Sequence, residues 1–154
     1  MSSWSRIVAL SARDRWLLGE SLVLLLLNKL ALRLVRLKNW QAVLARLSPL
    51  DAAEGCDAAA ALDRARRTAR LVSIAASRGL VRGNCLQQSL TLWVLLRRQK
   101  LTCEIKFGAR KDSGRFNAHA WVELGGVAMD ERRVAQRNFT PFERTTLRTA
   151  ARRR

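Results

Sequence analysis

The chain has 154 residues, of which 49% are hydrophobic, with only two prolines and eight glycines. This composition excludes a disordered or low-complexity chain and suffices for one domain with a buried core. The formal net charge of +17 predicts attraction to anionic partners but does not distinguish nucleic acid, a membrane surface and an acidic peptide.

The cysteines indicate a reducing compartment. Cys56, Cys85 and Cys103 are widely spaced and odd in number, which disfavours a disulfide framework and fits the cytoplasm. No secretory signal peptide is evident. The stretch from Trp16 to Val35 is rich in leucine but is interrupted by charged and amide side chains, whereas a spanning helix needs about 20 mostly apolar residues. We therefore expect no insertion into a membrane, and peripheral membrane contact remains open.

Helices are predicted before residue 79. Ser11 and Asp14 form a capping pattern, and apolar residues then recur at helical spacing, which indicates a long first helix from about Ala12 to Lys38. A shorter helix is expected from Trp40 to Leu47, and a third from Asp57 to Ser77, ending at the glycine that follows. We interpret these segments as a scaffold.

A central helix is predicted to begin at Cys85. Gly83 and Asn84 supply a turn and an N-cap, and Gln87, three residues after Asn84, completes a capping-box pattern. Cys85 then falls in the first turn, where unpaired backbone amides and the helix dipole favour a thiolate and could hold a developing oxyanion. Because apolar residues through Leu96 occupy nearly all sides, this helix should be central and buried.

Three strands are predicted after this helix. Strict alternation from Thr102 to Ala109 indicates a half-buried strand, with Cys103 packed in the core. A second strand is expected from Asn117 to Leu124. The pair Gly125-Gly126 is a two-residue hairpin signal that leads to a third strand, from Val127 to about Arg132.

The hairpin brings a carboxylate toward the histidine. With Leu124 paired to Val127, Asp130 shares the face of His119 as a diagonal neighbour, at about 7 to 8 Å between backbone positions. A three-residue loop would shift the register by one residue and bring Glu131 there instead. We therefore expect Asp130 beside His119, with Glu131 as the alternative.

Cys85, His119 and Asp130 follow one another in the order of nucleophile, base and orienting group. A thiol needs a nearby imidazole to become a thiolate at neutral pH, and the imidazole needs a third group that fixes its tautomer. His119 is the only histidine, so it is the only candidate base. Trp121 is interpreted either as a shield for the contact between His119 and Asp130 or as an ordinary packing residue, and Glu123 as a solvated or ion-paired strand residue.

Two segments carry a resemblance to a known family. Asn84-Cys-Leu-Gln-Gln-Ser-Leu90 and Phe116-Asn-Ala-His-Ala-Trp-Val-Glu123, followed by Asp130, resemble the core of transglutaminase-like, papain-related cysteine proteases. More closely, they resemble the B2 proteins of lasso peptide biosynthesis, which are the leader peptidases of that pathway. The resemblance covers about Leu80 to Glu131.

The predicted elements amount to an α+β fold. A helical N-terminal half and a central Cys-bearing helix are expected to pack on a small antiparallel sheet, and the resemblance implies that the core is transglutaminase-like or papain-like. We expect a single domain over residues 1–154, with a helical scaffold (1–78), a cysteine protease core (79–134) and a basic C-terminal segment (135–154).

The resemblance also implies an activity and partners. It implies a Cys-His-Asp triad that cuts a ribosomally made precursor peptide between leader and core, without a cofactor. The freed core amino terminus would then be closed into a macrolactam ring by a separate ATP-dependent lasso cyclase. Relatives that consist of the protease portion alone work with a separate leader-binding B1 protein, so we expect such a partner here.

Three alternatives remain. A zinc site from Cys56, Cys85, Cys103 and His119 lacks the close ligand spacing that such sites usually show, and we expect no metal. A basic, non-catalytic binding or scaffold protein, for nucleic acid or for the assembly of precursor and cyclase, would explain the charge. No nucleic-acid-binding signature accompanies that charge, so specific nucleic-acid binding is not expected. Acyl transfer is the third alternative, because an amine can capture the same thioester instead of water.

Overall fold

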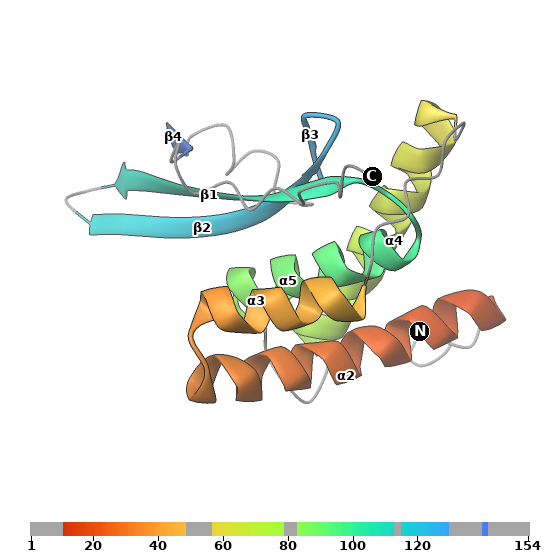
Figure 1. Ribbon diagram of the computed structural model, residues 1–154. Helices are drawn as coiled ribbons and strands as arrows, with labels where there is room; N and C mark the ends of the chain where they lie inside the picture. Colours follow the sequence, from red (N-terminus) through yellow and green to blue (C-terminus); the bar gives the residue numbers. More distant parts are fainter. Residues whose placement is uncertain (1–10, 49–56, 79–82, 113–114, 130–139, 142–154) are drawn as a thin grey trace, which may run out of the picture.

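Helices and a sheet form separate layers in the computed structural model, which describes residues 11–48, 57–78, 83–112, 115–129 and 140–141. The elements are α2 (Ala12–Leu34), α3 (Leu37–Leu47), α4 (Ala58–Arg78), α5 (Cys85–Arg98), β1 (Cys103–Asp112), β2 (Arg115–Leu124), β3 (Val127–Ala128) and β4 (Thr140–Pro141). The sheet lies on one side of α5, and α2 lies on the other (Figure 1). This is the α+β arrangement that the sequence predicted.

The chain reverses between α2 and α3, where the sequence analysis predicted one helix as far as Lys38. That prediction is wrong because Val35 is extended, with φ −130° and ψ 144°, and α3 starts directly afterwards. The reversal returns Trp40 to α2, where its indole N–H donates to Asn28 Oδ1 at 2.8 Å. A continuous helix would carry Trp40 away from the core, so tertiary contacts override the local helical pattern.

The core is centred on α5. Every residue from Leu90 to Arg97 is buried, which confirms the prediction of a central helix. Complete burial of each large apolar side chain contributes about 1.5–3 kcal/mol. Asn28 is also buried, and its amide donates to Thr91 Oγ1 at 2.9 Å, so α2 is joined to α5 by a satisfied polar contact as well as by packing.

The sheet has the order β3-β2-β1-β4, and its neighbouring strands are antiparallel. Ile105 of β1 lies opposite Val122 of β2, and both side chains are fully buried in the cluster formed with the helices. The neighbouring pair, Lys106 and Trp121, therefore lies on the other face of the sheet. β4 lies within residues 135–154, where a basic C-terminal segment was expected and no strand was predicted.

The predicted hairpin between β2 and β3 is confirmed. Leu124 pairs with Val127, and the turn residues Gly125 and Gly126 have φ values of +56° and +79°. A two-residue turn with both φ values positive favours glycine, because other residues are strained there. Only Val127 and Ala128 are assigned to β3, and Met129 follows without a strand assignment. The rest of the predicted strand, residues 130–132, lies outside the described residues.

Two ion pairs fasten α2 to the other helices. Asp14, which is 4% exposed, accepts from Arg67 Nε of α4 at 2.8 Å, and Glu20 pairs with Arg98 of α5. The hydrogen bond from Arg67 holds the pKa of Asp14 below its usual value, against the opposing effect of burial. α2 also exposes large apolar side chains, yet among the described helices none has both the length and the apolar character needed to cross a membrane.

Candidate active site

Cys85 is the first residue of α5, and the helix start is held by a complete capping box. Asn84 Oδ1 accepts the backbone N–H of Gln87 at 2.9 Å, and Gln87 Oε1 accepts the backbone N–H of Asn84 at 3.1 Å. This confirms the local prediction from the sequence. Cys85 therefore lies among the unpaired amides at the positive end of the helix dipole, where a thiolate is favoured.

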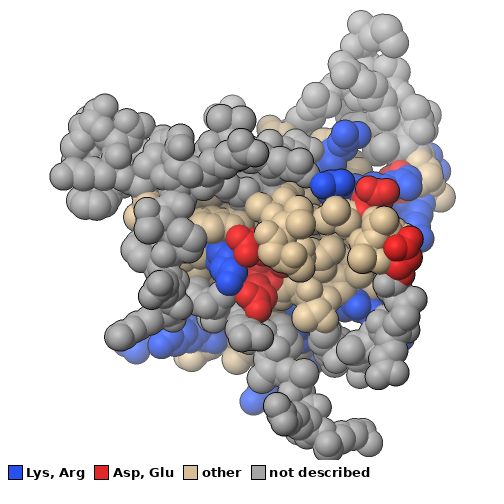
Figure 2. Space-filling model, turned by 90° about the horizontal axis from the view of Figure 1, so that it is seen from above, with Lys and Arg blue, Asp and Glu red and all other residues tan. Residues whose placement is uncertain are grey.

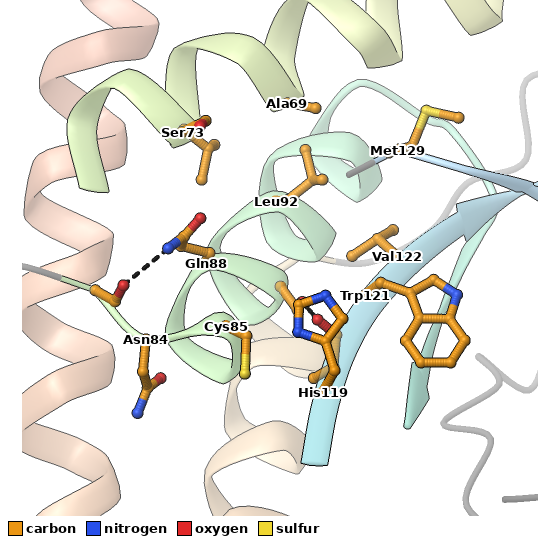
Figure 3. A pocket seen from close by; sticks show the side chains of 14 residues that line it. Ala69, Ser73, Asn84, Cys85, Gln88, Leu92, His119, Trp121, Val122 and Met129 are labelled. Atoms are coloured by element: carbon orange, nitrogen blue, oxygen red, sulfur yellow. Dashed lines mark hydrogen bonds between the residues drawn. The ribbon is translucent and has the colours of Figure 1, made fainter. Parts of the chain in front are cut away.

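The residue before this cap is packed tightly against two other helices. A Cβ at Gly83 would lie 2.9 Å from Leu25 Cδ2 of α2 and 3.5 Å from Ala76 Cβ of α4. The Gly83 carbonyl also accepts from Gln88 Nε2 at 2.8 Å (Figure 3). The scaffold helices thus pack against Gly83, two residues before Cys85, which gives the N-terminal half a direct part in the geometry of the site.

The start of α5 is joined to the edge of β2. Ser89 Oγ donates to the Ala120 carbonyl at 2.9 Å, and both residues are buried. Ser89 follows Cys85 by four residues, so the two side chains lie on the same face of α5. This contact was not predicted from the sequence, although a hydroxyl on an otherwise apolar helix, one turn after the cysteine, was a signal for it.

Cys85 of α5 and His119 of β2 lie next to each other where the helix contacts the strand (Figure 3). A hydrogen bond from the His119 side chain lowers the pKa of the half-buried Cys85 thiol. The backbone amides of Ala120 and Leu86 and the charge of His119 act in the same direction, and burial acts against them. The structure therefore brings together the two residues predicted as nucleophile and base, and it favours the thiolate form.

Cys103 has the opposite environment. Its side chain is 1% exposed in the core, and its sulfur lies 3.9 Å from the Trp93 carbonyl oxygen. Burial raises the pKa of Cys103 to about 12. The prediction that Cys103 is a packing residue is confirmed, and of the two described cysteines only Cys85 has a lowered thiol pKa.

His119 stacks on Trp121. Their ring centroids are 6.1 Å apart with an interplanar angle of 18°, and Trp121 is 4% exposed. The Trp121 indole N–H donates to Glu123 Oε1 at 2.8 Å. Glu123 was interpreted as a solvated or ion-paired strand residue; the structure adds that its half-buried carboxylate is the acceptor for a buried tryptophan.

A cavity of about 150 Å³ opens beside the cysteine (Figure 3). Cys85, His119, Asn84, Gln88 and Ser89 give it a polar side. α4, α5, β2 and the residue after β3 provide an apolar side, formed by Ala69, Val72, Leu92, Val122 and Met129. The cavity can therefore take a small apolar side chain while a polar backbone lies against the cysteine and histidine.

The third predicted member of the site cannot be placed with the other two. Asp130 and its alternative Glu131 lie outside the described residues, as does Cys56. One backbone hydrogen bond reaches past β3 to the residue before Asp130, since the Met129 N–H donates to the Val122 carbonyl at 2.9 Å. Within the described ranges, no three His, Cys, Asp or Glu side chains gather as a metal site would require.

Charge is mixed on the face seen in Figure 2. Among the described residues, basic and acidic side chains both border an area without charged groups. The described basic side chains on this face therefore do not form a continuous surface of the kind that tracks a nucleic-acid backbone.

Comparison with known protein families finds a match over most of the chain. Residues 26–144 match the family described as the transglutaminase-like superfamily. The matched region includes α3, α4, α5, β1 and β2, and with them both Cys85 and His119. No curated protein and no solved structure matches the chain.

Proposed function

The chain belongs to the transglutaminase-like superfamily, and on this premise we propose that it is a cysteine peptidase that removes the leader from a lasso precursor peptide. One observation carries the proposal. The Cys85 thiol, at the start of a buried helix, lies with His119 at the edge of a cavity, and His119 lowers its pKa. A nucleophile paired with its base in a concave site is the arrangement needed for covalent catalysis.

The proposed reaction has two stages. The Cys85 thiolate attacks the scissile carbonyl carbon, and the carbon–nitrogen bond breaks as His119 gives its proton to the departing amine. His119 then takes a proton from water, the resulting hydroxide attacks the thioester, and the leader leaves with a free carboxylate while Cys85 is regenerated. The backbone N–H of Cys85 is the proposed donor to the oxyanion.

Asp130 is the proposed orienting residue for His119, with Glu131 as the alternative. The support for Asp130 is the register of the β2–β3 hairpin, which follows the predicted pairing of Leu124 with Val127. Along such a ladder, side chains alternate between the two faces of the sheet, so the register decides which carboxylate shares the face of His119.

The substrate and partners are proposed from the resemblance to the B2 proteins. The precursor peptide is cut between leader and core in the cytoplasm, where a separate leader-binding B1 protein presents it. An ATP-dependent cyclase then uses the freed core amino terminus for ring closure. The cavity supports a peptide substrate, because its apolar side can hold one small side chain next to the scissile bond.

The decisive experiment is mass spectrometry of a candidate precursor, taken from the coding region beside that of this protein, after incubation with the wild type and the leader-binding partner. Cys85→Ala should abolish cleavage, and Cys103→Ala, which removes the packing cysteine, should retain it. His119→Ala should also lose cleavage, since it removes the only histidine.

The product masses separate the alternatives. Hydrolysis gives a leader with a free carboxylate, whereas acyl transfer gives a leader joined to an added amine. A precursor that stays intact with the wild type and binds equally well to Cys85→Ala would favour the non-catalytic scaffold. Full turnover by Cys85→Ala would refute the mechanism.

A further inference from the structure

Two side-chain contacts on one face of β2 connect Glu123 to Trp121 and Trp121 to His119. The imidazole stacks on the Trp121 indole at 6.1 Å and 18°, and the indole N–H is bound by Glu123 Oε1 at 2.8 Å. Trp121 is 4% exposed, so its N–H has little access to water and depends on this acceptor. Trp121 is therefore held by Glu123 and is itself the stacking partner of His119.

The opposite strand makes a carboxylate at position 123 electrostatically unfavourable. Glu104 of β1 lies directly across from Glu123, and like charges in such a pair destabilise a sheet. Lys106, across from Trp121, pairs with Glu104 at 3.0 Å between Nζ and Oε2 and offsets part of this repulsion. The contact of Glu123 with the Trp121 N–H is the interaction that favours an acceptor there.

We infer that Glu123 is a positioning residue for His119, acting through the indole of Trp121. The inference rests on the proposed function, because it concerns the alignment of the same Cys85 and His119. A hydrogen bond to a thiolate is directional, and the stacked indole restricts rotation of the imidazole out of line with the sulfur. Misplacement of a reacting group by about 1 Å can cost roughly 100-fold in rate.

The test is the pH dependence of Cys85 alkylation by iodoacetamide, measured by mass spectrometry of the Cys85 peptide in the full-length protein. Glu123→Leu removes the acceptor, so His119 is held less firmly, the pKa of Cys85 rises and the alkylation profile moves to higher pH. Glu123→Gln keeps an oxygen acceptor for the indole and should leave the profile in place. Glu104→Gln is the matched control, since it removes the carboxylate opposite Glu123 on β1 but leaves the contact of Glu123 with Trp121 in place.

A double-mutant cycle separates positioning from a general structural effect. Trp121→Phe keeps an aromatic ring under His119 but has no N–H for Glu123, so it should move the profile as Glu123→Leu does. In the Trp121→Phe background, Glu123→Leu should add no further shift. Among the strand residues whose side chains the structure describes, the charged groups on this face are Glu104, Lys106 and Glu123. The Glu104→Gln control removes the neighbouring carboxylate and its ion pair with Lys106 while leaving the acceptor for the Trp121 N–H in place.

The outcomes are distinct. The inference is overturned if folded Glu123→Leu or folded Trp121→Phe has the wild-type profile, or if Glu123→Leu shifts it equally in both backgrounds. If Glu123→Leu does not fold, the alkylation profile of Trp121→Phe is the test by itself, and a wild-type profile overturns the inference. Alkylation requires no peptide substrate, so a shifted profile together with an uncut precursor would refute the proposed function and leave the positioning role of Glu123 standing.

Discussion

Ser89 is the residue that joins the helix of the nucleophile to the strand of the base, and its replacement by alanine tests that joint. Its hydroxyl donates to the Ala120 carbonyl at 2.9 Å, with Ser89 5% and Ala120 4% exposed. Ser89→Ala leaves a buried carbonyl without this donor, which costs about 1–3 kcal/mol. We expect the free energy of unfolding to fall by about 2 kcal/mol in urea titrations.

The same variant should lose activity beyond its loss of stability. The joint sets the spacing between Cys85 and the strand of His119, so peptide cleavage by folded Ser89→Ala should fall by roughly tenfold, because small displacements of reacting groups are costly. Ser77→Ala is the control, since Ser77 is exposed and its hydroxyl contacts the Ile74 carbonyl at 3.3 Å within one helix. The control should change stability by less than about 0.5 kcal/mol. Equal effects of the two substitutions on stability and on cleavage would refute the argument.

Three further predictions follow from the described contacts. Gly83→Ala places a Cβ 2.9 Å from a core side chain of α2, so it should lower the free energy of unfolding by about 1–3 kcal/mol and reduce cleavage; an unchanged urea midpoint would contradict this. At mildly alkaline pH, peptide mapping should find Cys85 alkylated and Cys103 protected, because burial raises the pKa of Cys103 to about 12; equal rates would show that the core is open. The lowered pKa of Asp14 means that its ion pair contributes stability above the unfolded-state pKa and loses it as pH falls through the folded-state pKa. Asp14→Asn should therefore lose less stability than the wild type between neutral and acidic urea titrations.

The local geometry around both halves of the site could be predicted from the sequence, because it depends on interactions between near neighbours in the chain. Asn84 and Gln87 are three residues apart, and their side chains form the predicted capping box. Gly125 and Gly126 form the predicted turn, since few other residues accept two positive φ values in succession. These patterns placed Cys85 at a helix start and His119 on a strand next to a hairpin.

Tertiary contacts decided how these pieces meet. Trp40 contacts Asn28 only because α2 ends at Leu34, earlier than its helical pattern predicts. Ser89 binds the carbonyl of Ala120, 31 residues later in the chain, and so brings Cys85 to the edge of β2. Local spacing does not specify such a partner, because many hydroxyls and carbonyls could pair, and only the packing of α5 on the sheet selects one.

For Glu123, the sequence determines which face of β2 it lies on, and the tertiary structure determines what its carboxylate contacts. Alternation along β2 puts Glu123 on the face of His119 and Trp121. Its carboxylate could have met water, a lysine or the indole, and alternation does not choose among them. The choice depends on the burial of Trp121, whose N–H must find an acceptor once water is excluded, and that burial exists only when the whole sheet is assembled.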